Sequence, residues 1–412
     1  MQSSEGDPVG RPWKEIVLAF LTIGATAYGG PAIIGVMQTE LQEKRQWVSK
    51  ERFIEGLSLV NMLPGAAATQ LAIFLGYSRG GWAGGLLAGL CFVLPAFLIM
   101  LALTLGYAAY GATPLMRGAL FGLGPVVIAI FMVAVYRLGR TAVASTPQRL
   151  IALACALVAA FTPLGIMPIL ALAGATGVLL FHSRATGAAV LALVLAIIAA
   201  VGLWPGVSSV STAVSATVTS AGSASLAARS VDLLEIGTFF LKVGAFSFGG
   251  GLSLIAFIQE QVVNQYQWLT QREFIDGLAL GQFTPGPILM VSAYVGYKLA
   301  GIAGAAVAAT AIFLPAFVLM LSILPVFARA SKLLWMKAAM KAIAPAVIGV
   351  LAVSLTQMAS RALPDLLSVC LFVGTAVAML AWNLGAIKLM ILGAAFGMLR
   401  SRILSLPGIR IF

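Results

Sequence analysis

Charged residues are scarce in this sequence of 412 residues, of which 9% are charged and 61% hydrophobic. A soluble domain averages about 25% charged and about 45–50% apolar residues, so a water-soluble enzyme is nearly excluded. A helix that spans a bilayer needs about 20 mostly apolar residues, and apolar runs follow one another along nearly the whole chain. The composition therefore predicts a polytopic membrane protein.

Histidine and cysteine, the usual ligands of metal and redox sites, are also rare. His182 is the single histidine, and Cys91, Cys155 and Cys370 all lie inside apolar runs. Because the sequence has no CxxC motif and no Cys/His cluster, we expect no metal, haem or redox cofactor. Without a nucleophile and base that could act together, we expect that the protein is not an enzyme.

Acidic residues are fewer than basic ones: 13 Asp and Glu against 25 Lys and Arg give a formal net charge of +12. Cytoplasmic loops of membrane proteins carry such an excess, which also attracts anionic lipids. The alternative is an electric field that favours anionic substrates. Because the basic residues are scattered through short loops, we expect no nucleic-acid partner. No GxxxxGK[ST] motif occurs, which excludes ATP hydrolysis at a P-loop.

The sequence repeats itself at an offset of 220 residues, as from Gly24 to Gly244. The correspondence recurs far downstream, and one inserted residue raises the offset locally to 221. We interpret it as a duplication. The predicted parts are a disordered N-terminal tail over residues 1–13, a first copy over 14–204, a linker over 205–230 and a second copy over 231–412.

Apolar runs divided at proline, glycine and charge clusters predict seven helices in the first copy and six in the second. Seven crossings before the second copy would insert that copy in the opposite orientation. The predicted fold is an all-α polytopic membrane protein with about 13 transmembrane helices in two inverted-topology homologous halves, as in many secondary transporters. The predicted helices cover residues 14–35, 53–77, 82–108, 117–138, 148–162, 166–182 and 187–204, then 232–251, 274–297, 301–326, 338–358, 365–382 and 385–400.

Glycine and proline interrupt the helices at two matching places in each copy. Proline removes an N–H donor and glycine loosens the backbone, and a broken membrane helix is tolerated only inside protein or beside a wet cavity. Its free amides and dipole attract anions. Alternatively, these residues only permit a kink or close packing. The first break is Gly29, Gly30 and Pro31, answered by Gly249, Gly250 and Gly251; the second is Pro64 and Gly65, answered by Pro285 and Gly286.

Neutral polar residues cluster around the second break in both copies. Their hydrogen-bond donors suit the oxygens of an oxyanion, and the alternative is that they join helices to one another. The candidates are Asn61, Thr69 and Gln70 in the first copy and Gln282 and Thr284 in the second.

Three of the charged residues inside predicted helices are candidates for a function, because an ionisable group in a membrane helix is costly and usually functional. Lys242 lies about ten residues into its helix, and it is a substrate or coupling residue or else a structural one. Glu55 and Asp276 occupy equivalent positions a few residues after Ser49 and Thr270, which we predict to be N-caps. The two acids either complement the helix dipole or carry coupled protons.

Several of these motifs occur in one order that resembles the chromate ion transporter family over nearly the full chain. The resemblance implies a multi-pass carrier of the bacterial inner membrane that exports the chromate dianion and gives chromate resistance. It also implies two homologous halves of opposite orientation. The motifs are Gly24-x3-Tyr28-Gly29-Gly30-Pro31, Pro64-Gly65, Thr69-Gln70-Leu71-Ala72, Gly76-Tyr77 and Leu94-Pro95-Ala96-Phe97.

The sequence therefore predicts a secondary transporter that exports chromate by alternating access, with the broken helices and Lys242 around the anion. Its expected partners are chromate or a related oxyanion and membrane lipids, and a homodimer is an assembly that the sequence allows. The alternative has the same architecture and transports sulfate or another oxyanion.

Overall fold

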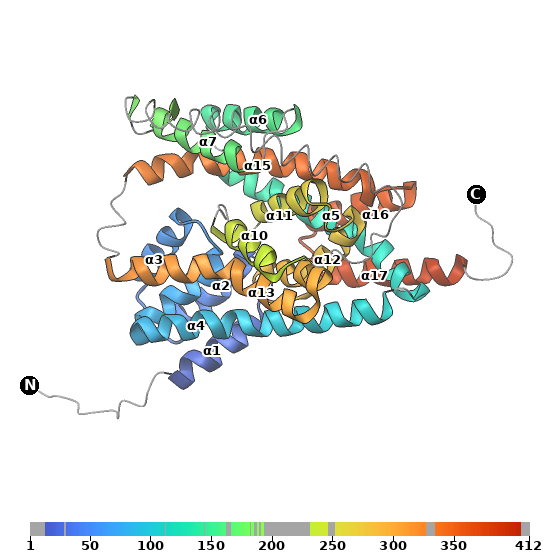
Figure 1. The fold of residues 1–412 in the computed structure, drawn as a ribbon, viewed down its shortest axis with the longest axis horizontal. Coiled ribbons are helices and arrows are strands. Elements are labelled where there is room, and N and C mark those ends of the chain that lie inside the picture. Colours follow the sequence, from blue (N-terminus) through green and yellow to red (C-terminus); the bar gives the residue numbers. More distant parts are fainter. Residues whose placement is uncertain are drawn as a thin grey trace, which may run out of the picture. The chain divides into compact units, whose positions relative to one another are not determined.

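The computed structural model describes residues 13–28, 30–111, 113–143, 145–161, 166–181, 183–184, 188, 191–192, 231–245, 252–326 and 334–404. Within these ranges every regular element is a helix (Figure 1). The α-helices are α1 (Trp13–Thr26), α2 (Gly30–Met37), α3 (Lys50–Met62), α4 (Ala67–Tyr110), α5 (Pro114–Ala142), α6 (Thr146–Phe161), α7 (Ile166–Phe181), α10 (Leu233–Ala245), α11 (Leu252–Gln259), α12 (Gln271–Phe283), α13 (Val291–Ile323), α15 (Leu334–Ala362), α16 (Leu366–Ala381) and α17 (Ala386–Leu404).

Short helices of other types complete the described elements. The π-helices η1 (Gln38–Lys44) and η2 (Glu260–Gln265) continue α2 and α11, and the 3-10 turns η3 (Ile288–Met290) and η4 (Leu324–Val326) flank α13. Because η1 and η2 fall at corresponding places in the two copies, the repeat extends to irregular helix geometry.

Among the described residues, four helical stretches are long and apolar enough to cross a membrane, which agrees with the predicted all-helical polytopic protein. They are Ala67–Tyr110, Pro114–Arg140, Ile288–Ile323 and Lys341–Ala359. The number of crossings and the opposite orientation of the copies stay predictions. The predicted helix over 187–204 lies almost wholly outside the described residues, as do the tail before Trp13 and the linker over 205–230.

The chain divides into two compact units. The first comprises Met1–Leu138, Leu233–Lys332 and Ser354–Phe412, and the second comprises Gly139–Asp232 and Leu333–Val353. Both copies contribute to each unit, so the units differ from the predicted repeats. In the second unit α6 and α7 pack on α15, where Gly349 meets the backbone of Ala152 and Gly177 meets that of Ala338.

Helix ends differ from the prediction at the breaks. The predicted helix over 14–35 is interrupted, because α1 ends at Thr26 and α2 begins at Gly30. The last residues of the predicted helix over 232–251 lie outside the described residues. The predicted helices over 53–77 and 274–297 are each interrupted, by residues 63–66 and by a turn that starts at Thr284. At the breaks that the structure describes, glycine and proline therefore lie where the helix is interrupted.

The segments on either side of each second break form an antiparallel helical hairpin. Gly56 in the middle of α3 lies against the ring of Phe74 in the first part of α4, and Gly277 in α12 lies in the same way against Tyr294 in α13. We call residues 63–66 the first tip and residues 284–287 the second tip. The arms of the hairpins pack side by side, so each tip is the end of a compact structure.

The long helices α4 and α13 each contain an internal turn, at which the helix folds back on itself. In α4 the turn lies at Gly80 and Gly81, where the φ of Gly81 is +62°, and in α13 it lies at Ala300 and Gly301. A Cβ at Gly76 would collide with the backbone of Gly84, so the two parts of α4 pack backbone to backbone. Small residues permit this approach in membrane helices.

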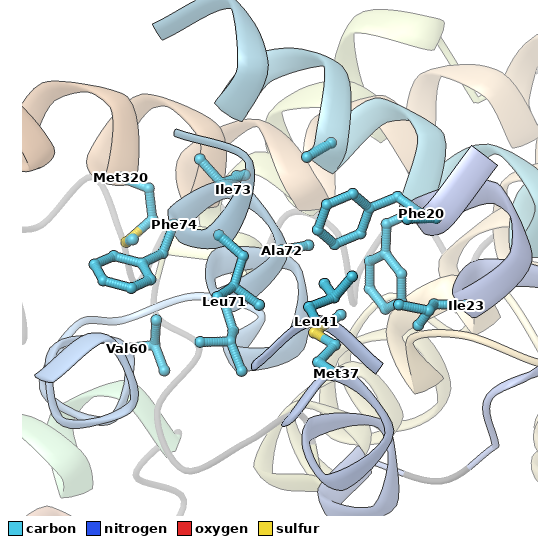
Figure 2. Packing of buried hydrophobic residues seen from close by; sticks show 14 of the residues in the cluster. Phe20, Ile23, Met37, Leu41, Val60, Leu71, Ala72, Ile73, Phe74 and Met320 are labelled. Atoms are coloured by element: carbon cyan, nitrogen blue, oxygen red, sulfur yellow. The ribbon is translucent and has the colours of Figure 1, made fainter. Parts of the chain in front are cut away.

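A cluster of apolar side chains surrounds the first hairpin (Figure 2). Phe20 from α1 and Phe74 from α4 are fully buried in it, together with Met320 from α13. Since lipid is as apolar as leucine, close packing rather than removal from water stabilises such contacts in a membrane. The cluster holds the first hairpin against helices from both copies.

Candidate functional site

The first tip is a tight turn that is held by a buried amide. Gly65 has φ +134°, a conformation that glycine adopts without steric cost. Gln70, one turn into α4, donates from Nε2 to the carbonyl oxygen of Pro64 at 2.7 Å. Thr69 and Gln70 are fully buried. Within the described part of the chain, Thr69 Oγ1 and Gln70 Oε1 have no hydrogen-bond partner.

The second tip has the same construction with different side chains. Gly286 has φ +93°, and its N–H donates to the carbonyl oxygen of Ala27 at 2.8 Å. Thr284 Oγ1 donates to the carbonyl oxygen of Leu280 at 3.0 Å and also contacts Met100 Sδ at 3.3 Å. Ser292, one turn beyond the tip, is fully buried. Its hydroxyl has no partner among the described residues.

Each tip packs against a helix of the other copy. A Cβ at Gly65 would lie 3.3 Å from Ala316 Cβ in α13, and a Cβ at Gly286 would lie 2.7 Å from Ala96 Cβ in α4. Ala96 and Ala316 are equivalent residues of the repeated Leu-Pro-Ala-Phe motif. Because α4 and α13 also pack on one another, with Gly89 beside Phe317, both tips lie against one pair of helices.

The helices that leave the tips begin inside protein. Ala66 is the N-cap of α4, and Met290 is the N-cap of α13, which follows the short turn η3; neither side chain caps its helix. The first amides of a helix have no partner within that helix, and they carry the positive end of its dipole. An anion with several oxygens is a chemically suitable partner for such a site.

Both halves of the chain match one family of membrane proteins. The sequence model of the chromate transporter family matches residues 14–180 and residues 234–398. The chain belongs to the chromate transporter family. This confirms the resemblance that the motifs indicate, and the family is one of transporters.

Three curated members of the family are similar to this chain over most of their length. The "Chromate transport protein" of Cupriavidus metallidurans is 32% identical over 93% of this chain and 91% of its own length. The "Probable chromate transport protein" of Synechococcus elongatus is 32% identical over 90% of both chains. The "Chromate transport protein" of Pseudomonas aeruginosa is 33% identical over 76% of this chain and 73% of its own. No solved structure matches the chain.

The two tips fall inside the two regions that match the chromate transporter family. Of the other predicted site residues, Gln282 is half-buried in the last turn of α12, and Pro285 is buried. Pro64 is half-buried. Gly30 and Pro31 begin α2, and Asn61 lies in the last turn of α3. The remaining ones, Gly29, Gly249, Gly250 and Gly251, lie outside the described residues.

The predicted charged residues of this protein do not gather at the tips. Lys242 is exposed near the end of α10. Glu55 is exposed and pairs with Arg52 at 2.9 Å. Asp276 is buried in α12, and its Oδ2 accepts a hydrogen bond from Tyr107 Oη at 2.9 Å. The equivalent acids of the two copies therefore have opposite environments.

The predicted helix caps are confirmed. Ser49 Oγ accepts from the N–H of Arg52 at 3.2 Å, and Thr270 forms a capping box with Glu273. Sequence reasoning missed Tyr107, whose partner Asp276 is 169 residues away. It also missed the contact of Ala96 and Ala316 with the tips. The repeat of the Leu-Pro-Ala-Phe motif in both copies was a signal that could have pointed to these two residues.

Proposed function

We propose that this protein exports chromate across the bacterial inner membrane and thereby gives chromate resistance. Membership of the chromate transporter family supports this substrate, since relatives that cover most of the chain are named as chromate transport proteins. Four apolar helical stretches support a membrane location. Export moves two negative charges out of a negative interior, which yields about 2.3 kcal/mol per charge per 100 mV. The membrane potential is therefore a sufficient driving force.

The anion site that we propose lies at the two hairpin tips. The observation that carries this proposal is a buried hydroxyl in the first turn of two helices that no side chain caps, Thr69 in α4 and Ser292 in α13. Neither hydroxyl has a partner among the described residues. Buried polar groups are rarely left without a partner. A chromate ion at the tips would accept hydrogen bonds from the hydroxyls and from backbone amides.

We propose further that the two copies, over residues 14–204 and 231–412, cross the membrane in opposite directions. Gly85 lies beside Leu321 and Gly89 lies beside Phe317. The part of α4 that follows its internal turn and the equivalent part of α13 therefore run antiparallel. Two opposed copies around a central site would permit alternating access. Leu90, Leu94 and Leu98 are about half exposed along α4, as expected for side chains that contact lipid.

The other residues that the sequence predicts for the site stay part of the proposal. Gly29, Gly30 and Pro31 with their counterparts stay proposed parts of the site, because Ala27 beside them accepts the hydrogen bond from Gly286. Asn61 and Gln282 stay proposed ligands near the tips. Lys242 stays a proposed source of positive charge, although its side chain is exposed on α10.

Sulfate is the second candidate cargo, because neutral donors recognise any tetrahedral dianion. Inverted membrane vesicles that contain the full chain, energised to a positive interior, test both anions with radiolabelled chromate and radiolabelled sulfate. We expect chromate uptake that exceeds the uptake of vesicles without the protein, and weaker uptake of sulfate. Sulfate uptake that excess chromate does not reduce would contradict chromate as the substrate.

A whole-cell measurement tests export directly. Cells with the protein should accumulate less chromate than cells without it at matched growth. Equal or higher accumulation, with the protein present in the membrane, would contradict export.

A further inference from the structure

Asp276 is a buried carboxylate that the two-tip site does not use. It is 7% exposed, whereas the side chain of its counterpart Glu55 is 54% exposed and pairs with Arg52. Burying a charge is costly unless partners compensate for the lost water. Both copies therefore have an acid at this position, and of the two only Asp276 is buried.

The hydrogen bond to Asp276 comes from the other copy. Tyr107 lies near the end of α4, in the first copy, and its Oη donates to Asp276 Oδ2 at 2.9 Å. The ring of Tyr294, in the α13 arm of the second hairpin, packs edge-on against Tyr107 with centroids 5.8 Å apart. Asp276 therefore joins the second hairpin to a long helix of the first copy.

The charged side chains near Asp276 do not replace its hydrogen bond to Tyr107. Arg272 and Glu273 on α12, Lys298 on α13 and Tyr107 on α4 act electrostatically on Asp276. Lys298 is held by Glu273, at 2.7 Å. Among the described residues, no cation forms an ion pair with Asp276.

We propose that Asp276 binds and releases a proton during the transport cycle, and that the Tyr107–Asp276 hydrogen bond is a proton-controlled link between the two copies. A hydrogen bond to a carboxylate is about twice as strong as one between neutral groups. Protonation of Asp276 therefore weakens one of the contacts that hold the second hairpin to α4. This inference rests on the proposed transport function and adds its regulation.

The test measures radiolabelled chromate flux in proteoliposomes with the full chain over a pH series. Because chromate itself takes up a proton, the readout is the ratio of each variant to the wild type at each pH. We expect Asp276→Asn to lose the pH dependence that the protein contributes, and Asp276→Glu to retain it. Glu15→Gln is the matched control, since Glu15 is an exposed acid that pairs with Arg79, and it should follow the wild type.

Tyr107→Phe separates a proton link from simple packing. It removes a hydrogen bond that favours the charged carboxylate, so the pH midpoint of transport should move to higher pH. A purely structural role would instead lower the rate equally at every pH and would overturn the proposal. If Asp276→Asn does not reach the membrane, Asp276→Glu and Tyr107→Phe carry the test.

Two further results would overturn the assignment to Asp276. One is a wild-type pH profile in Asp276→Asn. The other is loss of the pH dependence in Glu55→Gln but not in Asp276→Asn. If the wild type transports sulfate and not chromate, the proposed substrate is wrong, and the same variants are compared with sulfate.

Discussion

The N–H of Gly286 donates to the carbonyl oxygen of Ala27 at 2.8 Å, which ties the second tip of one copy to the end of α1 in the other. This bond places the second break of the second copy beside the first break of the first copy. Two interruptions that are far apart in the sequence therefore act as one structure, as a shared anion site requires.

Gly286→Ala should impair both folding and transport. The residue has φ +93°, and a Cβ would lie 2.7 Å from Ala96 Cβ. Strained backbone of this kind costs about 1–3 kcal/mol, which thermal unfolding in detergent would measure. Gly374→Ala is the control, because Gly374 lies in α16 with no atom within 4 Å of the added Cβ. Equal stability of the two variants would contradict the tip geometry.

Thr69→Val and Ser292→Ala should separate binding from folding. Both hydroxyls are buried without a partner among the described residues, so their removal costs no protein hydrogen bond and should leave stability unchanged or raise it by about 1 kcal/mol. Chromate transport should show a higher KM, because donors to the anion are lost.

Thr104→Val is the matched control for these two variants. Thr104 is buried in the same helix as Thr69, and its hydroxyl donates to the carbonyl oxygen of Met100 at 2.7 Å. Its KM should be that of the wild type. An unchanged KM in Thr69→Val and Ser292→Ala would remove these hydroxyls from the site.

Single cysteines at Glu51 and Arg272 should be labelled from opposite sides of the membrane. These exposed residues are equivalent, at the starts of α3 and α12. In a background that lacks the three native cysteines, a membrane-impermeant maleimide applied to right-side-out and inverted vesicles should label one position in each. Labelling of both positions from the same side would contradict opposite orientation of the copies.

Asp365→Ala should destabilise α16 by about 1 kcal/mol, the usual cost of losing an N-cap. Asp365 accepts from the N–H of Ser368 at 2.9 Å and pairs with Arg400 at 3.0 Å. Partial burial raises its pKa, but the bonds to Ser368 and the charge of Arg400 lower that pKa below its ordinary value.

The sign of the pH effect at Asp365 follows from the lowered pKa. Its contribution is fully present above the ordinary carboxyl pKa of about 3.9 and is lost as the pH falls through the lower folded value. Thermal unfolding of the wild type and Asp365→Ala should therefore converge in acid. A constant difference down to the lowest pH would contradict this assignment.

Local signals allowed the sequence to predict much of the fold. Pro64, Gly65, Pro285 and Gly286 act on their own backbone, so the second breaks could be located, and the caps at Ser49 and Thr270 depend on neighbours three residues away. The sequence could not show that the arms of each hairpin pack side by side, since no local pattern encodes that direction.

Long-range packing determined the rest of the site. The burial of Asp276 depends on Tyr107 in the other copy, and the exposure of Lys242 depends on which face of α10 packs on α13. Glu55 and Asp276 are equivalent in the repeat, so the sequence led to the same prediction for both. The side chains around them differ, because Phe74 lies in the first hairpin where Tyr294 lies in the second.

The position of bound chromate tests the proposed site most directly. Crystals of the full chain with chromate, measured at the chromium absorption edge, should give an anomalous peak within hydrogen-bond reach of Thr69 or Ser292, at the start of α4 or α13. A peak beside Lys242 on the outer face of α10, with none at the tips, would contradict the proposed site.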